Sequence, residues 1–442
     1  MNDTNDEMFA KISPEPNVAE LEGKQTRERL WTSNFFLLWQ GQIVSAIGDV
    51  VYEIALGFWI LAVTGSTALM GTLMAASVLP RVLVSPFAGV WVDRSDRKWL
   101  IVLTDLIRGL VVLVVAIGAL QGWIQIWMVF AAGVVLGLCG AFFNPAVTSS
   151  LPDIVPTSKL LQANSVYSMV YAGSGILGNS FGGFLYALFG APLMFLVNGL
   201  SFLYSTLSVL FVRIPKIRRE TPPQHFFADM RDGYRFVWHW RSLRWLLIFA
   251  ACANFFVTIG IVVVIPLFQR TPQLGPGFYG VVMALVTGGQ LLGMLLTSVI
   301  PIPPARRYPL FVVSFALSIG LFTLFPVTLN VPFMATVGFL AGLFNAVGNV
   351  LLQTVMQLTV PAEMRGKVFS LLGGLSQGLV PIAMALGGVL ATFIPLRLLI
   401  GIAFAMPIIP FLPLLMMKDF RSFFLPKLAA IVSEESSTNA PG

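Results

Sequence analysis

Charged residues are scarce in this chain. Asp, Glu, Lys and Arg make up 11% of its 442 residues, and hydrophobic residues make up 57%, whereas about a quarter of a typical soluble domain is charged. So little charge excludes a soluble enzyme and an enzyme held by one membrane anchor. It predicts a polytopic, all-α integral membrane protein.

Cysteine and histidine are also rare, with two of each. Cys139 and Cys252 both lie in apolar runs, where we expect them to pack rather than to form a disulfide or bind a metal. His225 and His239 fall in one polar segment, which excludes a histidine relay within the membrane. The phosphate-binding pattern G-x-x-x-x-G-K-[ST] is absent, so ATP is not the direct drive. We therefore expect no metal, no cofactor and no enzymatic site.

Twelve apolar runs are long enough to cross a bilayer as helices, and they fall into two sets of six. The first set occupies about 34–62, 66–92, 99–120, 124–148, 160–188 and 191–212. The second set occupies about 244–269, 277–300, 308–329, 332–358, 366–393 and 397–417. The sequence thus predicts two six-helix bundles, over 34–212 and 244–417, that are joined by a loop at 213–243.

Positive charge is distributed unevenly around these spans. Of the 27 Lys and Arg residues, all but four lie in the two tails or in the loops that follow the second, fourth, sixth, eighth and tenth spans. The four exceptions are Arg81, Arg108, Arg270 and Arg397. The positive-inside rule then places both tails, 1–33 and 418–442, in the cytoplasm. The net charge of +7 has the same explanation, so we expect no nucleic-acid partner.

The loop at 213–243 contains Phe226-Phe-Ala-Asp-Met-Arg-Asp-Gly-Tyr-Arg-Phe-Val-Trp238. Apolar and basic positions alternate there at helical spacing. This pattern predicts an amphipathic helix that lies on the inner surface of the lipid bilayer.

The two halves repeat particular residues at constant offsets. Residues 205 positions apart match at Asn144, Val155, Pro156, Ser165, Gly182 and Gly183, which correspond to Asn349, Val360, Pro361, Ser370, Gly387 and Gly388. Residues 209 positions apart match at Gly71, Met74, Ala75 and Arg97, which correspond to Gly280, Met283, Ala284 and Arg306, and the basic Lys98 corresponds to the basic Arg307. Duplicated bundles around a central site are the usual plan of secondary transporters.

Polar and charged side chains inside a bilayer are costly and usually functional. The first three spans carry a group of them: Gln42, Ser45, Asp49, Glu53, Arg81, Asp105 and Arg108. Three acids face two arginines, and a carboxylate without a partner in a low dielectric can load and release a proton near neutral pH. We expect Asp49 to carry the proton, with Glu53 as the second candidate. The alternative is a static ion-pair network that orients helices, above all at Asp105 and Arg108.

Uncharged amide side chains recur in the second half. Asn345, Asn349 and Gln353 follow one another at four-residue spacing in the tenth span, and Asn254 lies in the seventh. We expect these residues, together with Gln42 and Ser45 of the first span, to line a central substrate cavity. Hydrogen bonding between helices is the alternative.

The loop between the second and third spans reads Gly89-Val-Trp-Val-Asp93-Arg94-Ser-Asp96-Arg97-Lys98. Gly89 permits a close helix approach, Asp93 can meet a helix N-terminus of the other half, and Arg97 is within reach of Asp93. Such contacts can latch the cytoplasmic side shut and break on reorientation. A solvated, positively charged loop is the alternative. Candidate partners lie in equivalent loops: Asp153, Glu363 and Arg365.

This loop resembles the G-x-x-x-D-R-x-x-R-K signature of the major facilitator superfamily, although Asp96 stands where the family usually has glycine. The segment from Gly173 to Gly183 resembles the G-P-x-x-G-G motif of proton-driven antiporters, with Asn179 in place of proline; generic small-residue packing is the alternative. Further patches resemble the branch with macrolide-efflux proteins and enterobactin exporters: Ile47-Gly-Asp49, Pro86-Phe-Ala-Gly89, Asn144-Pro145, Leu151-Pro-Asp153, Asp229 to Trp238 and Arg365-Gly-Lys-Val368.

The resemblance covers roughly residues 33–417. It implies a bacterial inner-membrane antiporter that expels an amphipathic small molecule, such as a drug, a macrolide or a siderophore-like compound, in exchange for protons. We also expect a monomer. The same carboxylates would serve a proton symporter that imports a small solute, which is the main alternative. A membrane receptor or an integral enzyme is the alternative from another class, and an enzyme would need a nucleophile–base pair or a metal cluster.

Overall fold

The computed structural model describes residues 30–215, 226–360, 362–417, 420–421 and 424. Within these residues every regular element is a helix, and eleven stretches are long and apolar enough to cross a membrane. One stretch, Thr157–Leu210, contains two helices, because Gly190 has non-helical backbone angles with a φ of 68°. Counting both helices gives the twelve crossings that the sequence predicts, and the all-α membrane fold is confirmed.

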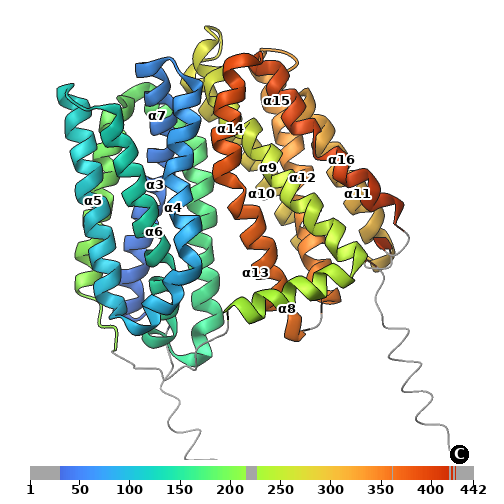
Figure 1. Ribbon diagram of the computed structural model, residues 1–442, viewed down its shortest axis with the longest axis horizontal. Coiled ribbons are helices and arrows are strands. Elements are labelled where there is room, and N and C mark those ends of the chain that lie inside the picture. The colour runs from blue at the N-terminus through green and yellow to red at the C-terminus, as the bar shows by residue number, and fades with distance from the viewer. Residues whose placement is uncertain (1–29, 216–225, 361, 418–419, 422–423, 425–442) are drawn as a thin grey trace, which may run out of the picture.

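The first bundle consists of α3 (Ser33–Thr64), α4 (Thr67–Arg94), α5 (Arg97–Gln121), α6 (Ile126–Ile154), the short 3-10 helix η1 (Thr157–Lys159) and α7 (Leu160–Leu210). The second bundle consists of α9 (Arg241–Arg270), α10 (Gly275–Val299), α11 (Pro304–Leu324), α12 (Val331–Thr359), α13 (Ala362–Gly378), α14 (Val380–Phe393), α15 (Leu396–Ala405) and α16 (Ile408–Met416). Two crossings are interrupted, so that α13 continues as α14 and α15 continues as α16. Between the bundles, α8 (Phe226–His239) forms at the position predicted for an amphipathic helix and lies across one end of the second bundle (Figure 1).

The helices begin and end where the sequence supplies caps. The side chains of Thr32, Ser66 and Asn330 each accept a hydrogen bond from a backbone N–H in the first turn of α3, α4 and α12. Gly65 and Gly122 end α3 and α5 in the left-handed conformation, which a side chain would strain. Because the connections are so short, consecutive helices run in opposite directions.

The second limb of α7 runs antiparallel to α3 after the reversal at Gly190. Ser205 lies beside Gly41 and Asn198 lies beside Gly48, so the residue numbers rise in opposite directions along the two helices. This packing brings the serine-rich face of the second limb against the polar stripe of α3.

The two bundles share a hydrophobic core at the end of the molecule opposite α8, called the far end below. This core joins Phe58 of α3 to Ile265 and Phe268 of α9 and to Ala383 of α14. Toward α8 the core divides into two clusters, one in each bundle. Figure 1 shows the same arrangement, since the ribbons of α4 and α14 are close at the far end and diverge toward α8.

Two glycine pairs allow the backbones of the bundles to touch near the far end. A Cβ on Gly71 of α4 would lie 2.8 Å from the Cα of Gly388 in α14, and a Cβ on Gly183 of α7 would lie 2.7 Å from the N of Gly280 in α10. Such distances leave no room for a side chain, so these crossings require glycine. The sequence repeat relates Gly71 to Gly280 and Gly183 to Gly388, so the two crossings are pseudo-symmetric copies of one contact.

Candidate functional site

A polar cavity of about 160 Å³ lies in the first bundle. Its lining includes most of the polar side chains singled out in the first three spans: Gln42, Ser45, Asp49, Glu53, Arg81 and Arg108. Met384 of α14 also contributes to the lining, so the cavity borders the second bundle. Asp105 is absent from the lining and is completely buried behind it.

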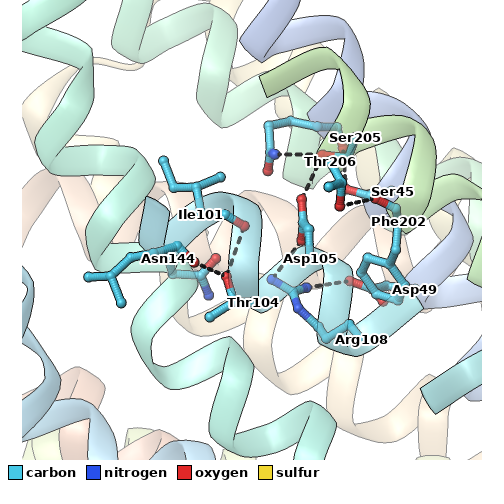
Figure 2. A network of polar contacts seen from close by, with 12 residues as sticks. Ser45, Asp49, Ile101, Thr104, Asp105, Arg108, Asn144, Phe202, Ser205 and Thr206 are labelled. Carbon is cyan, nitrogen blue, oxygen red and sulfur yellow. Dashed lines mark hydrogen bonds and ion pairs between the residues drawn. The ribbon is translucent and has the colours of Figure 1, made fainter. Parts of the chain in front are cut away.

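Arg108 of α5 lies between two carboxylates (Figure 2). Its Nη2 is 3.2 Å from Oδ1 of Asp105, and its Nη1 is 3.9 Å from Oδ2 of Asp49. The Ser205 hydroxyl donates a hydrogen bond of 2.7 Å to Oδ2 of Asp105. The Asp49 side chain is 44% exposed, whereas those of Arg108 and Asp105 are 7% and 0% exposed. Arg108 therefore connects a buried carboxylate to one that faces the cavity.

Two aromatic rings hold the Arg108 guanidinium from the sides. Its central carbon lies 4.0 Å from the ring centroid of Phe143 and 4.8 Å from that of Phe202. A desolvated cation over an aromatic ring gains about 2 kcal/mol. No sequence pattern distinguishes Phe202 from the other residues of an apolar span, whereas Ser205 belongs to a helically spaced polar row with Asn198, Ser201 and Ser208 that could have indicated a polar helix face. Their roles depend on α7 turning back at Gly190.

Glu53 and Arg81 are both exposed and both line the cavity. Within the part of the chain that the structure describes, neither side chain makes a hydrogen bond or an ion pair. Glu53 follows Asp49 by one helical turn on α3, so the two carboxylates lie on one face of the helix. Glu53 is thus a carboxylate that a proton or a cation can reach without displacing a protein partner.

A second cavity, of about 460 Å³, lies in the second bundle. It brings together the four predicted amides, Asn254, Asn345, Asn349 and Gln353, with aromatic and aliphatic side chains. Asn254 donates a hydrogen bond of 2.7 Å to the Ser376 carbonyl, and Asn349 donates one of 3.0 Å to Oδ1 of Asn345. Gln353 is exposed to the cavity and has no hydrogen-bond partner among the described residues.

The residues predicted to form a cytoplasmic latch lie at the α8 end. Arg97 pairs with Asp153 at 2.6 Å and donates to the Ser149 carbonyl at 3.1 Å, both within the first bundle. Lys98 donates to the Leu210 carbonyl at 2.7 Å, also within that bundle.

The remaining latch residues do not bridge the bundles where they are described. Arg365 donates to the Val360 carbonyl at 2.9 Å within the second bundle. Arg94 is exposed, and a Cβ on Gly89 would meet nothing within 4 Å. The side chains of Asp93 and Glu363 lie outside the described part of the structure.

One hydrogen-bonded chain at the first cavity was not predicted. Tyr171 donates to Oδ1 of Asn144 at 2.9 Å, and the hydroxyls of Tyr167 and Tyr171 are 2.9 Å apart. Because Tyr171 donates to the amide, Tyr167 donates to Tyr171. Tyr171 and Asn144 line the cavity, while Tyr167 is buried in the core cluster at the α8 end. The four-residue spacing of the two tyrosines is the one signal that could have indicated this chain.

Two pseudo-symmetric six-helix bundles, each with a cavity between membrane-crossing helices, define a polytopic membrane transporter. A sequence model of the Major Facilitator Superfamily matches residues 38–385, and the chain belongs to this family. The family that the sequence resemblance indicated is confirmed.

The relatives with known names include efflux proteins. The chain is 25% identical to macrolide efflux protein A of Streptococcus pyogenes over 369 residues. This alignment covers 82% of this chain and 90% of that protein. It is 28% identical to the multidrug efflux pump Tap of Mycolicibacterium fortuitum over 361 residues. That alignment covers 79% of this chain and 87% of the pump.

Solved structures share the fold. A bacterial homolog of the human lysosomal transporter Spinster, in an inward-facing and unoccupied conformation, superposes with a TM-score of 0.60 at 16% identity, covering 88% of this chain and 95% of that one. The nucleoside transporter NupG superposes with a TM-score of 0.63 at 12% identity, covering 86% of this chain and 100% of that one.

Proposed function

We propose that this protein exports an amphipathic small molecule in exchange for protons by alternating access. The observation that carries the proposal is the separation of charge between the two cavities. The first cavity contains carboxylates and arginines, whereas the lining of the second contains amides, aromatics and aliphatic residues and no charged side chain. A volume of about 460 Å³ is within the range of small-molecule pockets, about 300–1,000 Å³, and 160 Å³ is below it. We therefore assign the proton to the first cavity and the main body of the substrate to the second.

The proton carrier is one of the two cavity-facing carboxylates. Protonation of Asp49 weakens its contact with Arg108, whose charge is then balanced by Asp105 alone. Protonation of Glu53 breaks no hydrogen bond or ion pair, because this side chain makes none among the described residues. On this geometry Glu53 is at least as strong a candidate as Asp49. A membrane potential of 100 mV contributes about 2.3 kcal/mol for each charge that moves across it, so exchange for one proton is a useful drive.

The conformational part of the proposal rests on the contacts between the bundles. They meet near the far end through the shared core and the glycine crossings, and their cores separate toward α8. The distribution of Lys and Arg favours a cytoplasmic α8 end with both tails on that side of the inner membrane. We infer from these two observations that the structure represents an inward-open state, and we propose that the protein acts as a monomer. In the opposite state, residues of the 89–98 loop contact the second bundle near Glu363 and Arg365.

Lumenal pH measured in inside-out membrane vesicles tests this proposal. The vesicles are given an acid interior and a pH-sensitive fluorophore, and macrolides, amphipathic dyes and catechol siderophores are added one at a time. Proton antiport predicts that the interior becomes more alkaline when a substrate enters, and that vesicles without the protein do not respond. Substrate accumulation without proton movement would overturn antiport. In vesicles loaded with a compound beforehand, its exit together with protons would instead identify the protein as a symporter that imports its solute.

A further inference from the structure

The corner between α8 and α9 carries an exposed surface that the transport cycle does not use. Four residues of α8, Arg231, Tyr234, Arg235 and Trp238, are all exposed. They follow one another at positions i, i+3, i+4 and i+7, so they lie on one face of the helix. Val237 lies on another face and is buried in the core of the second bundle. The packing of α8 therefore fixes which face points away from the protein.

The first turns of α9 continue this surface. Arg241, Arg244 and Ile248 share one face at positions i, i+3 and i+7, and Arg241 and Ile248 are exposed. Arg244 donates a hydrogen bond of 3.2 Å to the Trp238 carbonyl, and its guanidinium lies 5.0 Å from the Trp238 ring. The rings of Tyr234 and Trp238 stack with their centroids 5.3 Å apart. The residues of both faces form what we call the α8–α9 patch: Arg231, Tyr234, Arg235, Trp238, Arg241, Arg244 and Ile248.

The positive charge of the patch is not compensated by the described protein. Arg231, Arg235 and Arg241 make no ion pair among the residues that the structure describes. Clustered arginines next to membrane-crossing helices attract anionic lipids, and Trp and Tyr favour the level of the headgroups.

We propose that the α8–α9 patch binds the headgroup of an anionic phospholipid. The arginines bind the phosphodiester group, and the stacked rings of Tyr234 and Trp238 lie at the level of the headgroup. Ile248 is exposed seven residues beyond Arg241 on the same face of α9, about 10 Å further along the helix axis. It meets the beginning of an acyl chain. This order, cations at the helix start and then an exposed apolar side chain, matches a lipid and does not match a nucleic acid.

Binding of phosphatidylglycerol to the detergent-purified full-length protein tests this site, with phosphatidylcholine as the uncharged comparison. The test variant is R235Q/R241Q, because both side chains are exposed and free of described contacts and the fold does not depend on them. The control is R213Q/R306Q, which removes the same charge from two exposed arginines at the same end. Affinities are read by native mass spectrometry.

We expect phosphatidylglycerol to bind more tightly than phosphatidylcholine. Each arginine near an anionic lipid surface contributes a factor of about five, so R235Q/R241Q should bind phosphatidylglycerol about 25-fold more weakly, and R213Q/R306Q should bind it as the wild type does. If both double variants lost the same affinity for phosphatidylglycerol, net charge alone would explain the loss, and the proposed site would be overturned. Equal binding of both lipids would overturn it too, as would a short RNA that displaces phosphatidylglycerol.

Discussion

Arg108 is the residue around which the charged site is organised. Its guanidinium stays charged in any protein environment, and it is held by two rings and by carboxylates on two sides. Asp105 is nearer than Asp49 and is fully buried, so Arg108 keeps one counter-ion whatever the state of Asp49. The acid that faces the cavity is therefore free to change its charge without leaving a buried cation alone.

Replacing Arg108 with glutamine is expected to destabilise the protein strongly. The change leaves Asp105 buried without its cation, and breaking a buried ion pair on one side costs about 3–5 kcal/mol. Arg81→Gln is the matched control, because Arg81 lines the same cavity but is exposed and makes no hydrogen bond or ion pair among the described residues. Thermal unfolding in detergent measures both. A melting temperature of Arg108→Gln equal to that of Arg81→Gln would contradict the structural importance of the buried pair.

Gln353 is the amide of the second cavity that is available to a ligand. Gln353→Leu should raise the apparent KM for the transported compound about fivefold, since one hydrogen bond contributes about 1 kcal/mol. Asn254→Leu should act differently, because Asn254 is already bonded to the Ser376 carbonyl and its loss lowers stability. Concentration dependence of transport and thermal unfolding separate the two effects. An unchanged KM in Gln353→Leu would remove this side chain from the substrate site.

Individual residues differ in how far the sequence could predict them. Asp49, Glu53 and Arg108 stand out because ionisable groups are rare in apolar spans, and all three line the first cavity. Ser205 and Tyr167 show only a helical spacing to other hydroxyl residues, which does not identify their partners on other helices. Their contacts depend on which helices become neighbours, and a single helix carries no such information.

At the scale of elements, the glycine crossings determine how closely the bundles approach. The span pattern predicts the helix ends to within six residues, because apolar length and turn residues are local properties. The break at Gly190 is also a local property, because it depends on the backbone angles of that one glycine between two helical limbs. The contact between Gly71 and Gly388 is not local. Its residues are visible in the sequence only as members of the repeat, and the repeat does not say which helices touch.

Gly183→Val is expected to open the far end. A Cβ at this position would lie 2.4 Å from the Pro276 carbonyl oxygen, so the bundles must separate there. Gly173→Val in the same helix is the matched control, because a Cβ there meets nothing within 4 Å. Spin labels on Val63 and Phe393, which are exposed at the far end, report the separation in a chain without its two native cysteines. Longer distances should appear in Gly183→Val alone, and identical distributions in both variants would refute the role of the crossing.

At the scale of the whole molecule, the structure joins two dissimilar half-sites through one closed end. The first half supplies charge and the second supplies an uncharged pocket, although the two halves are repeats of one plan. On the proposed mechanism, proton and substrate bind different surfaces and share one conformational change. The proposal therefore predicts that proton coupling depends on the carboxylates, whereas the conformational exchange of the bundles does not.

The most direct measurement compares uphill transport with equilibrium exchange in vesicles that contain wild-type protein or D49N/E53Q. Once a substrate is known, we predict that the double variant loses at least about nine-tenths of its transport driven by a pH gradient. It should still exchange labelled for unlabelled substrate at a rate near that of the wild type, because its cavities and bundle contacts are intact. The single variants then identify which carboxylate carries the proton. Wild-type uphill transport by D49N/E53Q would contradict proton coupling at these residues.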